Sequence, residues 1–184
     1  MSTTTRPAAV AGLFYPGDAR ALRAQVGQML VASPPDAAAV DPKILVVPHA
    51  GYVYSGPVAA QAYARLARAR GRISRVVLLG PTHRVAVRGL AVPTVAAFDT
   101  PLGRVALDRD AIAGLSDLPQ VVASDAVHAE EHALEVQLPF LQTVLDGFAL
   151  VPLAVGRVNP EAVAQVLERL WGGDETLIVI STDL

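Results

Sequence analysis

The chain has 184 residues, 52% hydrophobic and 17% charged, which is enough for one domain with a substantial apolar core. The net charge of −2 and the lack of a basic run argue against a nucleic-acid or anionic-membrane partner, and the lack of cysteine excludes thiolate chemistry. No apolar stretch approaches the ~20 residues that span a bilayer, and the first residues lack the layout of a signal peptide. We therefore expect a cytoplasmic protein that forms a single domain over residues 1–184.

The first half of the chain alternates helix and strand signals. In chain order the pattern predicts a helix over 18–31 capped by Asp18, a strand over 44–47, a helix over 57–70 that starts at Pro57, and a strand over 76–79. Both strands are short continuous apolar runs, as expected of strands buried on both faces.

The second half continues the alternation. It predicts a strand over 90–95, a hairpin over 98–108 and a short helix after Asp108. A helix over about 129–145 follows, in which Pro139 causes a kink or a late start. The last predicted elements are a strand over 148–155, a helix from Asn159-Pro160 to Gly172, and a strand over 176–180. The order favours an α/β fold with a mainly parallel or mixed central sheet and helices on both faces.

Polar residues follow three of these strands. His49 ends VVPH, His83 ends VVLLGPTH, and Asp183 follows IVIST. Ligands of such sheets bind beyond the carboxyl ends of the strands, so parallel strands would bring the three side chains to one edge. Two imidazoles and a carboxylate suit Fe(II), Zn(II) or Cu(II). The alternatives are histidines that bond to the backbone in loops, and an Asp183 that caps a following helix.

The loop after His49 suggests a ligand-binding cleft. A helix that starts at Gly56-Pro57 would offer free backbone N–H groups to an anionic group of a substrate, with Ser55 beside it. Tyr54 either lines this cleft or packs, and packing is the first expectation. The same cleft would serve a non-enzymatic module that binds a peptide or a phosphorylated ligand.

The stretch HAEEH, residues 128–132, matches H-x-x-E-H literally. On a helix both histidines would share a face and reach one zinc ion, as in a zinc protease. The alternative is that His132 and Glu135, one turn apart, face the strand ends as proton-handling or orienting groups. A third reading is an acidic helix start that favours the helix dipole.

Several phrases together resemble one family. RPAAVAGLFYP, VVPHAGYVYSG, LLGPTHR, FDTPLGRV, EEHALEVQLPFL and IVISTDL are similar, in this order, to segments of the Memo family, which is called AmmeMemoRadiSam system protein B in many prokaryotes. The resemblance spans nearly the whole chain. It implies the fold of the class III extradiol dioxygenases, with iron or copper at the strand ends.

Residue by residue, the resemblance implies metal binding by His49 and His83, a pocket position for Asp183 and a secondary role for His132 and Glu135. We expect His132 and Asp183 to be catalytic and Tyr54, Ser55, Gly56 and Glu135 to contact the ligand. Fe(II) is the first expectation for the cofactor, with copper or zinc as alternatives. The implied activity is a redox or dioxygenase-type reaction on an unidentified small molecule or peptide.

The chain departs from the family pattern at its end. The family continues beyond the aspartate with another pocket histidine and, in eukaryotic members, a cysteine ligand. This chain stops at Leu184, directly after an apolar strand. We therefore expect a form of the family fold that lacks its C-terminal part.

Overall fold

The computed structural model describes residues 4–34 and 40–183. Its strands, in chain order, are β1 (Thr5–Arg6), β2 (Ile44–Pro48), β3 (Arg75–Pro81), β4 (Leu90–Val92), β5 (Ala97–Thr100), β6 (Gly103–Ala106), β7 (Val121–Ala123), β8 (Ala149–Val155) and β9 (Thr176–Thr182). Its helices are α1 (Ala19–Val31), α2 (Tyr52–Ala64), α3 (Arg109–Ala113), α4 (Asp125–Ala129), α5 (Leu138–Val144) and α6 (Pro160–Leu170), with short 3-10 turns at Ala67–Ala69 and Glu135–Gln137.

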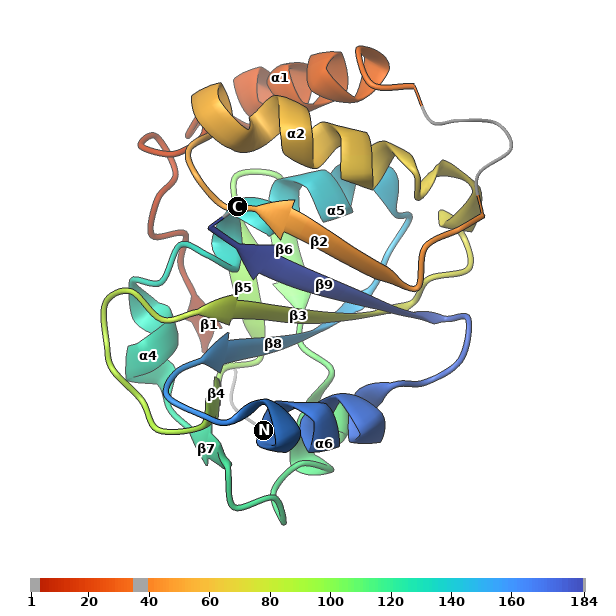
Figure 1. The fold of residues 1–184 in the computed structure, drawn as a ribbon. Coiled ribbons are helices and arrows are strands. Elements are labelled where there is room, and N and C mark those ends of the chain that lie inside the picture. Colours follow the sequence, from red (N-terminus) through yellow and green to blue (C-terminus); the bar gives the residue numbers. More distant parts are fainter. Residues whose placement is uncertain (1–3, 35–39, 184) are drawn as a thin grey trace.

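Within the described residues, six strands form the main sheet in the order β2-β9-β3-β8-β4-β7 (Figure 1). Neighbouring strands are parallel except β4 and β8, which are antiparallel. Helices α1, α2 and α5 lie on one face of this sheet and α6 on the other (Figure 1). The predicted α/β fold with a mainly parallel sheet and helices on both faces is confirmed. A smaller sheet, β1-β5-β6, contains the predicted hairpin.

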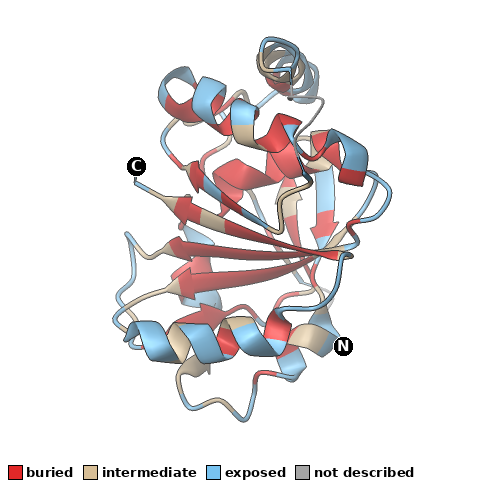
Figure 2. Cartoon of the chain, turned by 45° about the vertical axis from the view of Figure 1, so that its right-hand side comes forward, coloured by how far each residue is buried: buried red, intermediate tan, exposed pale blue. Residues whose placement is uncertain are grey.

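The core is centred on β3, β8 and β9. The residues of β3 from Val76 to Leu79 are almost fully inaccessible, because helices cover both faces of this central strand (Figure 2). Local signals also behave as predicted: the Asp18 carboxylate accepts the N–H of Ala21 at the start of α1, and Asn159 caps α6 in the same way. None of the helices in the described ranges has the length and apolar character of a membrane span.

The prediction that the strand at 44–47 is buried on both faces is wrong. Leu45 and Val47 are buried against the helices, but Ile44 and Val46 are 43% and 53% exposed. β2 lies at the edge of the sheet, beyond the cover that α6 gives to the opposite face (Figure 1). A short apolar run alone does not distinguish an edge strand from a central one.

The predicted helix start at Gly56-Pro57 is also wrong, because α2 begins at Tyr52 and contains Pro57 in its second turn. Tertiary contacts fix this earlier start. The Tyr52 N–H donates to the oxygen of Phe14, and the buried Tyr52 hydroxyl donates to the oxygen of Val136 at 2.7 Å. Burial of this tyrosine outweighs the preference of proline for the first helical position.

The predicted long helix over 129–145 is divided. α4 ends at Ala129, and helical structure resumes only at Glu135, so Pro139 marks a late start of α5. The guanidinium of Arg6 donates to the oxygens of His128 and Glu131, at 2.6 and 2.7 Å, and so takes carbonyls that a continuous helix would use itself. The segment between the two helices, 130–134, is thereby free to carry side chains toward the strand ends.

Candidate metal centre

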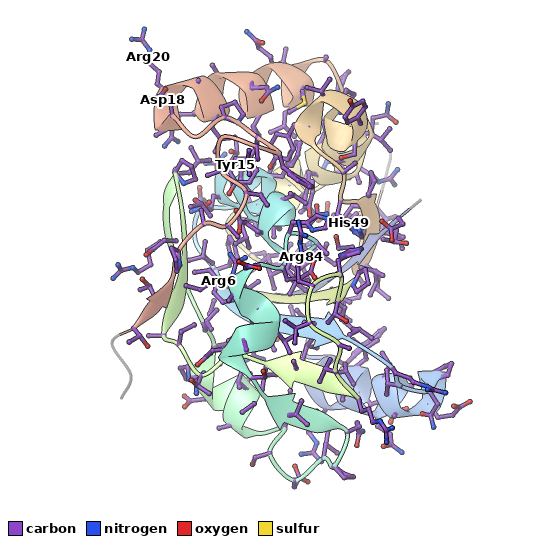
Figure 3. All side chains as sticks on the ribbon, turned by 90° about the vertical axis from the view of Figure 1, so that its left-hand side faces the viewer. Arg6, Tyr15, Asp18, Arg20, His49 and Arg84 are labelled. Atoms are coloured by element: carbon purple, nitrogen blue, oxygen red, sulfur yellow. The ribbon has the colours of Figure 1, made fainter. Side chains whose placement is uncertain are left out.

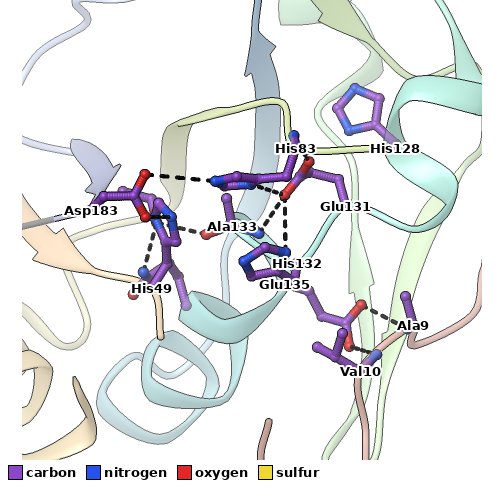
Figure 4. A network of polar contacts seen from close by, with 12 residues as sticks. Ala9, Val10, His49, His83, His128, Glu131, His132, Ala133, Glu135 and Asp183 are labelled. Carbon is purple, nitrogen blue, oxygen red and sulfur yellow. Dashed lines mark hydrogen bonds and ion pairs between the residues drawn. The ribbon is translucent and has the colours of Figure 1, made fainter. Parts of the chain in front are cut away.

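The strand register brings His49 and Asp183 together. β2 and β9 are parallel neighbours in which Pro48 pairs with Thr182, so the next residues in both strands lie side by side. The Nε2 atom of His49 is 2.7 Å from Oδ1 of Asp183. β3 flanks β9 on its other side, and Nε2 of His83 is 3.7 Å from Oδ2 of the same aspartate. The predicted convergence of these three side chains is confirmed (Figure 4).

Glu131 orients the ring of His83. Its carboxylate accepts the backbone N–H groups of His83 at 2.6 Å and Ala133 at 2.9 Å, and it lies 2.9 Å from Nδ1 of the His83 ring. Burial alone would raise the pKa of Glu131, but these hydrogen bonds outweigh it and hold the pKa below its usual value. The ionised carboxylate accepts the Nδ1 hydrogen, and in the neutral form of the ring this leaves the lone pair on Nε2 of His83.

His132 completes a cluster of three imidazoles. Its ring lies against that of His83, with centroids 4.6 Å apart and an interplanar angle of 30°, and its centroid is 5.6 Å from that of His49. Phe14, from the N-terminal segment, contacts the His132 ring with centroids 4.7 Å apart. One ligand atom from each of the three histidines lies within 4.8 Å of the others.

The residues of this cluster fit a metal ion. Nε2 of His49 and Nδ1 of His132 are buried ring nitrogens without a hydrogen-bond partner, although a carboxylate oxygen lies near each. Burial lowers the pKa of both rings, and the nearby carboxylates of Asp183 and Glu131 offset only part of this effect. Both imidazoles are therefore neutral near pH 7, the form that binds metal. The contact between His49 and Asp183 is short, but it lacks hydrogen-bond geometry.

A cleft opens beside this cluster. It has a volume of about 230 Å³, and its lining includes His49, Tyr54, Ser55, Thr182 and Asp183. Tyr54 is 82% exposed, so the expectation that it packs is wrong and it stands at the mouth of the cleft. The Ser55 hydroxyl donates to the oxygen of Ala50 at 2.8 Å.

Two of the residues predicted to contact a ligand lie elsewhere. Gly56 is buried against α1, where an added Cβ would come within 2.6 Å of the Met29 sulfur. The Glu135 side chain is 0% exposed, and its oxygens accept from Arg6, the Tyr15 hydroxyl and the N–H groups of Ala9 and Val10 (Figure 4). Glu135 therefore holds the N-terminal segment and does not face the strand ends.

The structure contradicts the zinc-protease interpretation of residues 128–132. α4 ends before His132, so His128 and His132 do not share a helical face. Nε2 of His128 bonds to the oxygen of Ala91 at 3.0 Å, and the ring lies apart from the other three histidines (Figure 4). Glu131 serves His83 instead of acting beside a zinc ion bound by HAEEH.

Four residues that shape the centre were not predicted as such: Arg6, Glu131, Gln137 and Ser181. Figure 3 looks onto the carboxyl edge of the sheet, with Arg6 and Tyr15 labelled on the N-terminal segment and His49 at the strand ends. Glu131 and Ser181 lie next to predicted residues in the chain, in EEH and STD, which is the only signal the sequence offers for them. Arg6 has no local signal, because its partners lie more than a hundred residues away.

Comparisons with known proteins give the family of the chain. The family model described as "Memo-like protein" matches residues 6–184. A "MEMO1 family protein" of Ignicoccus hospitalis is 39% identical over 97% of this chain and 68% of its own length. Proteins of the same name from Thermotoga neapolitana and Metallosphaera sedula are 36% and 34% identical, over 97% of this chain and 69% and 68% of their own lengths. The chain belongs to the Memo-like protein family.

Proposed function

We propose that the chain holds a non-haem metal ion at His49, His83 and His132 and uses it in a redox or dioxygenase-type reaction on a small molecule. The observation that carries the proposal is that His49, His83 and His132 each offer a ring nitrogen within 4.8 Å of the others. In addition, Nε2 of His49 and Nδ1 of His132 are buried without a hydrogen-bond partner. Buried polar atoms in native proteins are almost always satisfied, so two unpartnered ring nitrogens in this cluster support the binding of a cation.

Fe(II) is the ion that this donor set favours first. Imidazole suits iron, copper and zinc alike, whereas a nearby carboxylate with open positions is typical of non-haem Fe(II) oxygenases. Asp183 supplies that carboxylate, and its side chain is 74% exposed at the mouth of the cleft. Copper and zinc remain the alternatives.

Residues of the chain would have separate roles around the ion: metal binding, orientation of a ligand, proton transfer and substrate contact. The ion, when bound, supplies a Lewis acid that brings substrate and O₂ together. His49 and His83 hold it from neighbouring strands, and Glu131 fixes the ring of His83. Asp183 would accept a proton from a substrate, and Tyr54 and Ser55 would contact that substrate; the lining of the cleft by all three residues supports these roles.

The structure lacks the feature that suggested the alternative, a non-enzymatic module that binds a peptide or a phosphorylated ligand. That interpretation depended on a helix start at Gly56-Pro57, and α2 starts at Tyr52. We therefore propose a small molecule as the ligand of the cleft.

Anaerobic titration with Fe(II) tests the proposal. We expect one ion per chain in the unmodified protein and none in the double variant His49→Ala with His83→Ala. With the loaded protein, O₂ consumption in the presence of catechol as a probe tests the dioxygenase-type reaction. Full Fe(II) occupancy in the double variant would remove the site, and a loaded protein that never consumes O₂ with any phenolic probe would remove the reaction.

A further inference from the structure

We propose that Ser181 and Gln137 are positioning residues that lock His49 in the tautomer with hydrogen on Nδ1, so that Nε2 presents its lone pair to the cleft. This inference rests on the proposed metal site for its purpose, but the tautomer itself is a property of the metal-free protein. A chain of buried hydrogen bonds runs from Tyr63 through Gln137 and Ser181 to His49.

The amide of Gln137 has only one orientation that satisfies its neighbours. The nitrogen assigned as Nε2 lies 2.9 Å from the carbonyl oxygen of Pro48, an atom that only accepts. The amide nitrogen must therefore be on that side, and the amide oxygen accepts the hydroxyl hydrogen of Tyr63 at 2.9 Å. Gln137 is 1% exposed and Tyr63 is fully buried, so water does not compete for these contacts.

The hydrogen of the Ser181 hydroxyl is also assigned by its neighbours. Oγ of Ser181 lies 2.6 Å from the carbonyl oxygen of Ala133, and two oxygens at this distance require a hydrogen between them. Nε2 of Gln137 donates to the same Oγ at 2.8 Å. The Ser181 hydroxyl thus donates its single hydrogen to the oxygen of Ala133 and can only accept hydrogen bonds from its remaining neighbours.

The remaining neighbour of Ser181 is the His49 ring. Nδ1 of His49 lies 3.2 Å from Oγ, and since Oγ can only accept, Nδ1 must carry the hydrogen. A neutral imidazole has one ring hydrogen, so Nε2 of His49 bears a lone pair. Oδ1 of Asp183 lies 2.7 Å from Nε2 without hydrogen-bond geometry, so this contact assigns no hydrogen to Nε2.

The two strand-end histidines therefore reach the same tautomer through different acceptors. His83 donates to the ionised carboxylate of Glu131, and His49 donates to a neutral hydroxyl. Both then offer Nε2 to the same side of the centre, as Figure 4 shows for the contacts with Asp183. Loss of the Ser181 hydroxyl should free the His49 ring to exchange tautomers while His83 stays fixed.

Nitrogen NMR of metal-free, ¹⁵N-histidine-labelled protein near pH 7.5 tests the assignment directly. We expect the Nδ1–H pattern for both His49 and His83 in the unmodified protein. In Ser181→Ala, the signals of His49 should move toward the Nε2–H or mixed pattern, and those of His83 should not. The control Thr143→Val removes a partly buried hydroxyl that donates to the oxygen of Pro139. It should leave the tautomers of both rings unchanged.

Zn²⁺ affinity, measured by competition with a chelator, gives a second measurement. We expect Ser181→Ala to weaken Zn²⁺ binding by about 10–100-fold, the usual effect of losing a group that orients a ligand. If Ser181→Ala does not fold, Ser181→Cys keeps the shape and replaces the hydroxyl by a poor acceptor. An Nε2–H His49 in the unmodified protein overturns the proposal, as does a variant that melts earlier but keeps both tautomer and affinity. A protein that shows the expected tautomers and binds no metal would refute only the proposed function.

Discussion

Nε2 of His49 and Oδ1 of Asp183 lie 2.7 Å apart, although the two residues are far apart in the sequence. The contact follows from the parallel register of β2 and β9, in which Pro48 pairs with Thr182. It also places a buried imidazole against an exposed carboxylate at the mouth of the cleft. The arrangement of the candidate metal centre thus follows from strand order, with His83 added from the end of the strand on the other side of β9.

Removal of either strand-end histidine should abolish tight metal binding. We expect His49→Ala and His83→Ala each to weaken Zn²⁺ or Fe(II) affinity by more than ~100-fold, since loss of an orienting partner alone costs about 10–100-fold. The matched control is His128→Gln, which alters the histidine outside the cluster and should leave affinity unchanged. Equal metal binding in His49→Ala and His128→Gln would contradict the assignment.

The sequence was sufficient for the parts of the site that depend on local signals and parallel strands. His49, His83 and Asp183 each follow an apolar run, and the carboxyl ends of parallel strands meet at one edge whatever the order of the strands. The pattern predicts that the three side chains lie at the carboxyl edge of the sheet, but it does not predict the distances between them. These depend on β9 being inserted between β2 and β3, which no short-range signal indicates.

The parts that the sequence did not predict depend on partners distant in the chain. The break between α4 and α5 arises because Arg6 takes backbone oxygens of the intervening segment. Local periodicity gave no reason to end a helix there, so His132 and Glu135 were expected to face the same way. In the structure His132 faces the strand ends and Glu135 faces the N-terminal segment.

Glu131 should be required for full metal affinity. We expect Glu131→Gln to weaken Zn²⁺ binding by about 10–100-fold, because the ring of His83 loses the carboxylate that fixes its tautomer. The matched control is Glu130→Gln at the exposed neighbouring position. Identical affinities for the two variants, measured by the same chelator competition, would show that Glu131 only supports the loop.

A variant of His132 should separate its two candidate roles. If His132 is the third ligand, as we propose, His132→Ala lowers metal occupancy in anaerobic Fe(II) titration. If it instead transfers protons, as the sequence suggested, the variant retains one ion per chain and loses only turnover. Metal content and O₂ consumption measured on the same sample distinguish the two, and full occupancy would disprove the ligand role.

Arg6 should stabilise the loop that carries Glu131 and His132. Its guanidinium is 4% exposed, pairs with Glu135 at 2.7 Å and donates to two backbone oxygens. We expect Arg6→Ala to lower the free energy of unfolding by about 3–5 kcal/mol, because it leaves the buried Glu135 carboxylate without its partner. Arg6→Lys should recover little of this loss, since an ammonium cannot span the same three acceptors.

The control for Arg6 is an exposed ion pair of the same type. Arg104 pairs with Asp99 at 3.0 Å, and its side chain is 63% exposed. We expect Arg104→Ala to cost less than ~1 kcal/mol in urea unfolding. Similar unfolding midpoints for Arg6→Ala and Arg104→Ala would mean that the buried contacts of Arg6 contribute no more to the free energy of unfolding than a surface ion pair does.

The stability of the metal-free protein should fall in acid because of His128. Burial lowers the pKa of this ring from 6.5 to about 4, so the unfolded chain binds more protons than the folded protein between these values. Stability is therefore greatest above pH 6.5 and is lost as the pH falls toward 4. At 1.36 kcal/mol per pKa unit, the loss from this group is about 3 kcal/mol when complete. His49 and His132, whose pKa values are also lowered, act in the same direction.

Urea unfolding of metal-free protein at pH 7.5, 6 and 5 checks this expectation against His128→Gln. The amide can still donate to the oxygen of Ala91 but carries no titrating group, so the variant should lose less stability than the unmodified protein over this range. The difference between the two slopes isolates His128, because the carboxylates that also titrate in acid are common to both proteins. Parallel slopes would mean that His128 is protonated in the folded state at the same pH as in the unfolded chain, which its burial against the oxygen of Ala91 argues against.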